Sequence, residues 1–519
     1  MSGTSTGAEP HPRPRGNGRR WPSFARFSSS TGSSSAMSEA RSATSSWLGV
    51  RSLLWAAVGA YTAGFAALSM LRQRAFETGR FDLGNMVQAV WATAHGHPLA
   101  VTDLHGEQFT RLGAHVDPIL VLFAPLWWLW PSPDLLLTTQ AAAIALGAVP
   151  VFKLARKHLG NERAALGFAL SYLLLPAVQW LTLNEFHPVA LACPLLLWAF
   201  WFLDEDRLVA FAAMAFLAAT TKEEIPLVLA GFGVWYALSR GRRAVGSAIA
   251  VAGFAWTVLA VRVVIPHFND GATSSFYSRY SEVGGSPGGV LRTAVHDPGT
   301  LFATPFSHSG AHYLLQLLLP LGGLFLLAPL AAASALPELA INLLSATPPQ
   351  HSIHFHYTAG EIPPLVVASV LGAARVARRW PRAVTPIATA VVALALFANY
   401  RLGAIPLWSM LPGGEDYKAR AASVSRHDEI AARALRLIPP DVPVAATNSL
   451  GAHLSARRRV LSFPFVEDAD WIAADETQPG YSDRIAYLPT AVQLSWLRRS
   501  PSWRLVFEQD GVLVFKRVG

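Results

Sequence analysis

Long apolar runs separated by short polar segments fill most of the chain. A helix that crosses a bilayer needs roughly 20 predominantly apolar residues, and runs close to that length recur between residues 52 and 400. We predict membrane-spanning helices over residues 52–70, 135–154, 163–183, 188–203, 208–221, 225–239, 245–266, 313–332, 334–347, 359–376 and 383–400. The pattern therefore indicates an α-helical polytopic membrane protein with about 11 transmembrane helices.

Two further segments have a different pattern. Residues 82–94 have helical spacing, and their apolar face comprises Leu83, Met86, Val87, Val90 and Trp91. This predicts an amphipathic helix lying at the membrane interface. Residues 116–130 are apolar but short, and they contain Pro118, Pro125 and a cluster of tryptophans. They form either a surface-lying or re-entrant piece, or a further span.

Basic residues mark one set of the connecting loops. They are Arg156 and Lys157, then Arg240, Arg242 and Arg243, then Arg375, Arg378, Arg379 and Arg382. Cytoplasmic loops carry an excess of Lys and Arg. If 116–130 does not span, eleven helices place all these loops and the N-terminus in the cytoplasm, and they place loops 71–134 and 267–312 outside. If it spans, the sides invert after it.

The two ends of the chain differ from the membrane domain, which we assign to residues 47–402. Residues 1–46 are rich in Ser, Gly, Pro and Arg without apolar periodicity, which predicts a disordered cytoplasmic tail. Residues 411–519 predict a small soluble α/β domain, extracytoplasmic by parity. Its expected elements are a helix at 426–437, strands at 442–448, 459–465 and 470–475, and a hairpin at 503–518 over Asp510-Gly511.

Composition narrows the function classes. The chain is 52% hydrophobic and 14% charged, which excludes an ordinary soluble protein. The net charge of +9 comes largely from the tail and the Arg-rich loops, so it does not indicate nucleic-acid binding. The single cysteine, Cys193, excludes an intrachain disulfide and a cysteine-based metal site.

Acids and imidazoles gather in the segments predicted to lie outside. Asp82 follows the first span, where it either caps a helix or acts as a general base. His115, in GAHVDP, either orders the turn before Pro118 or binds an anionic phosphate. Glu185 and His187, in NEFHP, have the chemistry of an acid–base pair or of two ligands to a divalent cation.

Three more segments carry candidate residues on the same side. Lys222, Glu223 and Glu224, in TTKEEIP, form either an exposed loop end or a site in which Lys222 meets a phosphate and the acids hold a sugar hydroxyl or a metal. His354 and His356, in IHFHYT, alternate with Phe355, so an extended strand would put both imidazoles on one side, as a metal or phosphate clamp or as a surface loop. Arg279, in YSRYSEVG, is a candidate phosphate ligand. Neither a Gly-rich phosphate loop with a following Lys nor a nucleophile elbow occurs in the sequence, so ATPase and serine-hydrolase chemistry find no support.

Several motifs recur together in a known family. They are FETGRFDLGNMVQAVW, NEFHPVALACPLLLWAFWFL, KEEIPLVLAGFGVW, IPHF, YSRY, LPELAINLLS and HFHYTAGEIPP. Over residues 50–515 the chain resembles the bacterial membrane-protein family named domain of unknown function 2079. That family is in turn similar to the C-type glycosyltransferase superfamily, which uses lipid-phosphate sugars. The resemblance implies a C-type glycosyltransferase-like fold with an outer C-terminal α/β domain, and it implies that Asp82 is the catalytic or metal-binding acid of the first outer loop.

The expected function is therefore that of an integral membrane glycosyltransferase. It would transfer a sugar from a polyprenyl-phosphate donor to a cell-envelope acceptor on the outer face of the cytoplasmic membrane, with Asp82 as the base. His115, Lys222 and Arg279 would bind the donor phosphate. The residues expected to hold the sugar or a cation are Glu185, His187, Glu223, Glu224, His354, His356 and Tyr357. A divalent cation is the candidate cofactor, and its ligands are not assigned.

Two other functions remain open from the sequence. A transporter or flippase would carry charged residues within its spans, and Arg262 and Glu338 partly fit that pattern. A non-catalytic envelope-assembly protein would use the C-terminal domain to bind a partner and would not need Asp82.

Overall fold

The computed structural model describes the chain apart from residues 1–31, 105, 304, 416–422, 485–487 and 519. The chain forms two units, Met1–Gly49 and Val50–Gly519, and the second contains all the strands and every helix after the first. We predict disorder over residues 1–46. Residues 1–31 lie outside the described part, and the first helix, α1 (Gly32–Arg74), begins well before residue 46. Ala, Met, Glu and Arg in this stretch favour helix.

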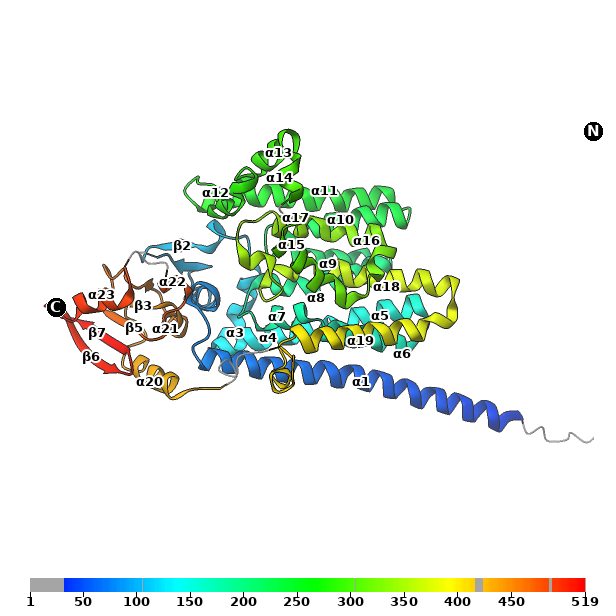
Figure 1. Cartoon of the computed structure of the whole chain (residues 1–519), viewed down its shortest axis with the longest axis horizontal. Coiled ribbons are helices and arrows are strands. Elements are labelled where there is room, and N and C mark those ends of the chain that lie inside the picture. The colour runs from blue at the N-terminus through cyan, green and yellow to red at the C-terminus, as the bar shows by residue number, and fades with distance from the viewer. Residues whose placement is uncertain (1–31, 105, 304, 416–422, 485–487, 519) are drawn as a thin grey trace, which may run out of the picture. The chain divides into compact units, whose positions relative to one another are not determined.

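Helices dominate the part of the second unit that precedes residue 402 (Figure 1). After α1 they are α4 (Pro133–Leu146), α5 (Ala148–Leu159), α6 (Glu162–Leu174), α7 (Pro176–Leu183), α8 (Ala192–Asp204), α9 (Leu208–Ala219), α10 (Ile225–Ser239), α11 (Arg243–Leu259), α12 (Ile265–Phe268), α15 (His308–Leu318), α16 (Pro329–Ala332), α17 (Leu336–Leu343), α18 (Ile362–Arg379) and α19 (Val384–Leu402). Their inner faces form one apolar core. Cys193 on α8 is sealed in that core, 0% exposed, with its Sγ 3.6 Å from the Tyr172 hydroxyl.

Few of the described helices are long enough to cross a bilayer alone. Four candidate spans pass by length and composition: Gly49–Arg74, Pro133–Leu159, Arg243–Phe268 and Pro381–Leu402. The α6–α7 pair, bent by 48°, makes a fifth if it is one span. The segments expected at 188–203, 208–221 and 225–239 are shorter apolar helices. The count of eleven therefore stays a prediction.

The segment at 313–332 differs most from the expected continuous helix. It breaks after α15 at Gly322 and Gly323, which adopt φ values of 62° and 70°. Such left-handed conformations are accessible to glycine without steric cost and end a helix. The following segment, 334–347, contains only the eight-residue α17 and a preceding 3₁₀ turn. Both segments are apolar enough to predict burial, but hydropathy does not indicate where a helix is interrupted.

Helices α10 and α11 approach each other closely through glycines. A Cβ atom on Gly246 would lie 2.5 Å from the Ala237 nitrogen and from the Gly233 oxygen, and one on Gly253 would lie 2.4 Å from the Pro226 oxygen. Small residues allow such backbone contact between membrane helices, where van der Waals packing drives association.

Replacing Gly246 with Val is expected to lower stability by about 1–3 kcal/mol, because the added side chain meets backbone atoms that cannot move aside. The measurement is the thermal unfolding midpoint in detergent or nanodiscs. Gly64→Val is the matched control, since nothing lies within 4 Å of a Cβ at Gly64. Equal midpoints for the two variants would contradict close packing at Gly246.

The segment after α1 folds as a compact loop. It contains η1 (Arg80–Gly84), α2 (Asn85–Ala94), β1 (Ala100–Thr102), β2 (Gln108–Thr110), η2 (Arg111–Gly113), η3 (Pro118–Phe123) and α3 (Ala124–Leu129). The helix expected at 82–94 is present as α2, but its apolar face packs on η3 and α3 rather than on lipid. The combined helix Pro118–Leu129 is shorter than a span, and Trp128 and Leu129 at its end are 69% and 83% exposed.

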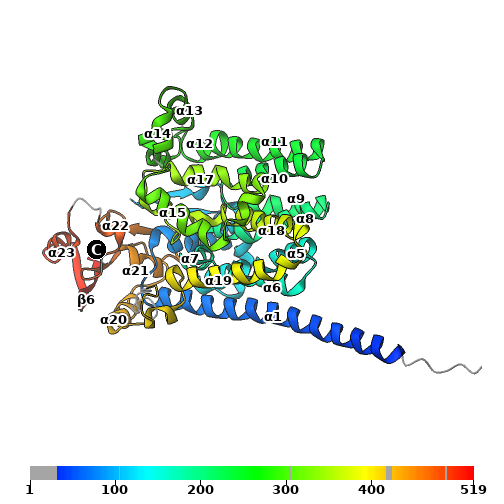
Figure 2. The same ribbon diagram turned by 45° about the vertical axis from the view of Figure 1, so that its right-hand side comes forward.

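A second long connecting segment follows α12. It contains η6 (Ser275–Val283), α13 (Pro287–His296) and α14 (Pro298–Ala303). The helices α12, α13 and α14 lie together at one end of α11 in both views (Figures 1 and 2). Three short 3₁₀ turns lie between other helices. They are η4 (Pro188–Leu191), before α8, and η10 (Pro348–His351) and η11 (His356–Ala359), between α17 and α18.

The chain after residue 425 forms a five-stranded mixed sheet. Its strands are β3 (Val444–Ala446), β4 (Val460–Ser462), β5 (Trp471–Asp475), β6 (Trp503–Gln509) and β7 (Val512–Arg517), in the order β4-β3-β5-β7-β6. β3 runs parallel to β4 and β5, whereas β7 is antiparallel to β5 and β6. The helices are α20 (Arg426–Leu435), α21 (Asn448–His453), α22 (Tyr481–Arg484) and α23 (Thr490–Leu497). α20 and α21 pack on one face of the sheet and α23 on the other.

Candidate functional site

Five segments distant in sequence surround one cavity of about 300 Å³. They are the loop after α1, the turn between α7 and α8, the turn between α9 and α10, η6 and η11. The lining residues are Phe81, Asp82, Asn85, Met86, Arg111, Ala114, His115, Asp117, His187, Pro188, Val189, Thr221, Lys222, Phe276, Arg279, His356 and Tyr357. Carboxylate, imidazole, cationic and aromatic groups therefore meet in a space large enough for part of a small ligand.

Asp82 is an accessible acid of this cavity. It lies in the π-helical turn η1, and its side chain is 51% exposed. Its Oδ1 lies 3.2 Å from Nε2 of the buried His187, whose Nδ1 lies 2.8 Å from the carbonyl oxygen of Asn184. Each ring nitrogen of His187 therefore lies within hydrogen-bonding distance of an oxygen atom, and the ring is held between Asp82 and the Asn184 backbone.

His356 stacks on His187, with ring centroids 3.7 Å apart. Its Nδ1 and its backbone nitrogen both lie 3.0 Å from Oδ1 of Asn184. Burial, followed by the nearby His187 and Lys222, lowers the pKa of His356 well below the ordinary value of a histidine. The His356 ring therefore packs against His187 as a neutral group, and Asn184 contacts both residues.

Glu185 binds the backbone of the turn that carries Asp82. It adopts a positive φ of 53°, and its carboxylate accepts the backbone N–H groups of Gly79 (3.0 Å) and Leu83 (2.8 Å). Burial and the negative charge of Asp82 raise the pKa of Glu185 to about 8, against the opposing effect of these N–H groups. Glu185 is therefore a structural partner of Asp82 rather than a ligand in the cavity.

The Glu185 carboxyl is expected to make stability depend on pH. Its pKa in the folded protein is raised above the unfolded value of about 4.3, so between these two pH values the folded state holds a proton that the unfolded chain has released. The contribution is complete below about pH 4.3 and is lost as the pH rises toward 8. Unfolding midpoints of wild type and Glu185→Gln between pH 4 and pH 9 should diverge in slope over this window. Parallel profiles would contradict the assignment.

Two ion pairs occupy the wall contributed by the α9–α10 turn. His115 Nδ1 lies 2.8 Å from Glu223 Oε1, and Glu223 also accepts the Val116 N–H. Burial opposes ionisation of Glu223, but His115 and Lys222 lower the pKa of that carboxyl to about 2. Lys222 Nζ lies 2.5 Å from Glu224 Oε1. Both acids are therefore matched to cations within the protein.

Arg279 on η6 differs from Lys222 in the partners of its charged group. Its guanidinium lies over the rings of Phe276 and Tyr357, at 4.5 and 6.0 Å from their centroids. Nη1 lies 3.3 Å from the Tyr357 hydroxyl. Among the described residues no carboxylate forms a salt bridge with Arg279, whereas Lys222 and Arg111, the other cations of the cavity, each have one. Arg279 therefore has charge available for an anionic ligand.

A family model described as "Predicted membrane protein (DUF2079)" matches residues 72–514. The chain belongs to the DUF2079 family. No curated protein matches the chain. Among solved structures, ArnT from Cupriavidus metallidurans bound to undecaprenyl phosphate matches with a TM-score of 0.46 and 14% identity, covering 88% of this chain and 98% of that one. The same protein in the apo state gives 0.45 and 15%, covering 89% and 98%.

The cavity of the DUF2079 protein brings together some of the residues expected from the sequence. Asp82, His115, His187, Lys222, Arg279, His356 and Tyr357 line it. Glu185, Glu223 and Glu224 lie behind the lining residues, as partners of backbone or cations. His354 points elsewhere: it contacts Trp180, and its Nδ1 lies 3.0 Å from the Ser352 hydroxyl. The alternation of His354 and His356 does not make a clamp, because residues 356–359 form a 3₁₀ turn rather than a strand.

The sequence missed other members of the DUF2079 site. Arg111 donates from Nε to Asp117 at 2.7 Å, both nearly buried, and Phe276 stacks on His115. Gln140, on α4, accepts the His187 N–H and donates to the carbonyl groups of Thr182 and Glu185. Its position inside a predicted span was the available signal, since a buried amide must find partners.

A metal site finds no support within the described part of the DUF2079 chain. No group of three or more His, Cys, Asp or Glu side chains there has the arrangement to hold an ion. The imidazoles that line the cavity instead contact Asn184, Asp82, Glu223 and one another.

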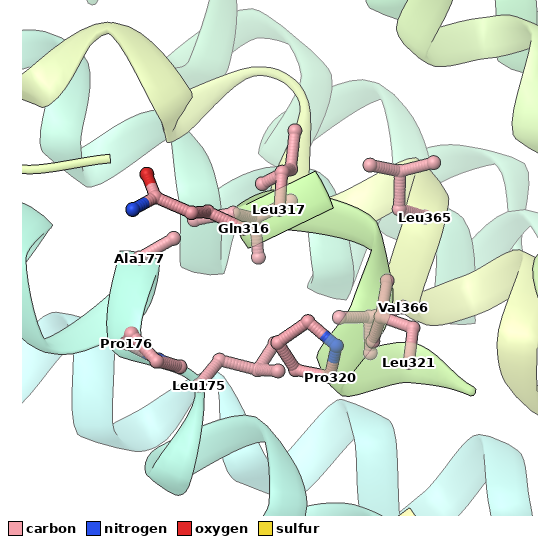
Figure 3. A pocket seen from close by; sticks show the side chains of 10 residues that line it. Leu175, Pro176, Ala177, Gln316, Leu317, Pro320, Leu321, Leu365 and Val366 are labelled. Carbon is pink, nitrogen blue, oxygen red and sulfur yellow. The ribbon is translucent and has the colours of Figure 1, made fainter. Parts of the chain in front are cut away.

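A second hollow of the DUF2079 protein is apolar. It lies at the bend between α6 and α7, with α15 and α18 opposite (Figure 3). The side chains of Leu175, Pro176, Pro320, Leu321 and Val366 surround it, and its volume of about 10 Å³ leaves room for no more than one small molecule the size of water. It is a packing defect at a bent helix rather than a ligand site.

Proposed function

We propose that this protein is a membrane glycosyltransferase that moves a sugar from a polyprenyl-phosphate donor to a cell-envelope acceptor at the outer face of the cytoplasmic membrane. One observation carries the proposal. A single cavity presents an accessible carboxylate, Asp82, and an arginine without a carboxylate partner in the described chain, Arg279. The resemblance of the DUF2079 family to C-type glycosyltransferases, which share an acidic residue in the loop after the first span, supports the same reaction class.

In the proposed reaction the acceptor hydroxyl gives its proton to Asp82. The acceptor oxygen then forms a bond to the anomeric carbon as the bond from that carbon to the phosphate oxygen breaks. The electron pair leaves with the phosphate, and Arg279 stabilises the negative charge that develops there. Tyr357 and Phe276 hold the Arg279 plane and offer faces on which a sugar can pack. The transferred proton reaches solvent through the exposed side of Asp82.

The test is turnover of lipid-linked sugars by the full-length protein in bacterial-lipid nanodiscs. A panel of radiolabelled polyprenyl-phosphate sugars is supplied with envelope lipid extract as acceptor, and free polyprenyl phosphate is measured as product. Product release that unlabelled polyprenyl phosphate inhibits would support the transferase. Saturable donor binding without release would favour a non-catalytic envelope protein. Transbilayer movement of an intact fluorescent donor in liposomes would favour a flippase.

A further inference from the structure

Arg80 joins the turn that carries Asp82 to the C-terminal sheet. Its side chain is 1% exposed. Nε donates to the Val460 carbonyl group and Nη1 to the Ser462 hydroxyl, both at 2.9 Å. Nη2 donates to the carbonyl groups of Thr102 and Asp103 at 2.8 and 2.9 Å. One guanidinium therefore ties strand β4, at the edge of the sheet, to the outer loop that follows α1.

The backbone of the same turn also contacts the C-terminal region, which comprises residues 426–518 and contains the five-stranded sheet. The Arg80 N–H donates to Asn448 Oδ1 at 3.0 Å, and Asp483 holds Asn448 by accepting its backbone N–H. Figure 2 shows α21 beside the blue segment that follows α1. The approach is close: Cβ atoms on Gly79 and Gly84 would lie 2.7 Å from Asn448 Nδ2 and 2.6 Å from Ser455 Oγ.

The opposite side of the turn rests on the helical region. Glu185 accepts the N–H groups of Gly79 and Leu83, so the turn is clamped between two parts of the fold. Asp82 lies between Arg80 and Leu83, whose backbones make these contacts, and its carboxylate contacts His187 in the helical region. An isolated π-helical turn is rare and occurs frequently at functional sites. The contacts on both sides of this turn fix its backbone, and with it the position of the Asp82 carboxylate.

We propose that the C-terminal region positions Asp82. Arg80 and Asn448 are the positioning residues, and they act through the backbone of the turn. The proposal rests on the proposed function in assigning Asp82 to the proton transfer. Arg80 is not among the residues that line the cavity, so it acts on the geometry of the base rather than on the substrate. A misplaced catalytic group lowers the rate even when the substrate still binds.

Amide hydrogen exchange of the full-length protein in nanodiscs tests the mechanical part. Arg80→Lys keeps the charge but cannot form the same fork of bonds, and Asn448→Ala removes the acceptor of the Arg80 N–H while leaving the guanidinium in place. We expect exchange at residues 79–85 to become at least tenfold faster in both variants, with exchange in α10 and α11 unchanged. Arg459→Lys is the control, because Arg459 binds the carbonyl group of Gly106 and Asp468 rather than the turn.

Unchanged exchange at 79–85 in Asn448→Ala would overturn the proposal. So would an acceleration that is equally large in β3, β4 and β5, because that would make the role of these residues one of domain stability only. If Arg80→Lys does not fold, Asn448→Ala alone decides, since it leaves no buried charge unpaired.

Kinetics test the coupling to Asp82. We expect both variants to lower kcat at least tenfold and to leave KM for the donor within twofold, because the donor does not touch either residue. A raised KM at constant kcat would overturn the positioning role. If Asp82→Asn keeps wild-type turnover while exchange responds as expected, the proposed function is wrong, but the positioning of the turn by Arg80 and Asn448 is supported. If exchange does not respond while Asp82→Asn is inactive, the positioning proposal is wrong and the proposed function is supported.

Discussion

Replacing Asp82 with Asn is expected to lower kcat for sugar transfer by about 10²- to 10⁴-fold, the usual contribution of a general base. The amide cannot accept the proton of the acceptor hydroxyl, yet it has almost the shape of the carboxylate and can still bond to His187. Helix positions and the unfolding midpoint should therefore change little. The measurement is release of polyprenyl phosphate under single-turnover conditions, with donor binding recorded separately.

Asp270→Asn is the matched control for this variant. Asp270 is an exposed acid of the segment after α12 with a φ of 51°, a conformation that Asn also tolerates, and it does not line the cavity. It should retain wild-type turnover. Turnover of Asp82→Asn within twofold of wild type would remove Asp82 from the reaction and favour a transport or assembly function.

Replacing Arg279 with Met is expected to raise KM for the donor by about 10- to 100-fold. A hydrogen bond to a charged group contributes about 1.5–3 kcal/mol, and Met keeps the length and the aromatic packing while losing the charge. Because the developing charge on the leaving phosphate is also stabilised by Arg279, kcat should fall as well. Arg279→Lys should recover part of the affinity. The measurements are donor titration and initial rates in nanodiscs.

Two further variants separate donor binding from folding. Arg292→Met alters an exposed arginine of α13 that does not line the cavity, and it should leave KM unchanged. Lys222→Met leaves Glu224 nearly buried without its partner at 2.5 Å, and breaking a buried pair in this way costs about 3–5 kcal/mol. Lys222→Met should therefore reduce the yield of folded protein. An unchanged KM in Arg279→Met would refute the assignment of the donor phosphate to Arg279.

The elements that the sequence predicts best depend on local rules. The hairpin over Asp510-Gly511 forms with φ values of 51° and 76° at those two residues, as the Asp-Gly signal indicates. The helix expected at 426–437 is α20, which begins with a capping box between Ser425 and Asp428. By contrast, hydropathy cannot distinguish a helix that crosses the bilayer from short helices broken at Gly322 and Gly323.

Side-chain partnerships were beyond local rules. Sidedness alone suggested that Asp82 and His187 lie on one face of the membrane, but their contact joins residues 105 positions apart. The pairing of His115 with Glu223 joins residues 108 positions apart, and no local pattern connects them. Arg80 gave no sequence signal, because a lone arginine between two spans reads as an exposed loop residue although its side chain is buried.

The burial of Cys193 has a practical consequence for spectroscopy. With 0% exposure and the Tyr172 hydroxyl against its sulfur, the chain's single thiol is inaccessible to maleimide and methanethiosulfonate reagents in the folded protein. Wild-type protein is thus a natural background for site-directed labelling. Paired spin labels or fluorophores, one on α23 and one on α13, would report distances between the sheet and the segment after α12 when a candidate donor is added, without prior removal of a native cysteine.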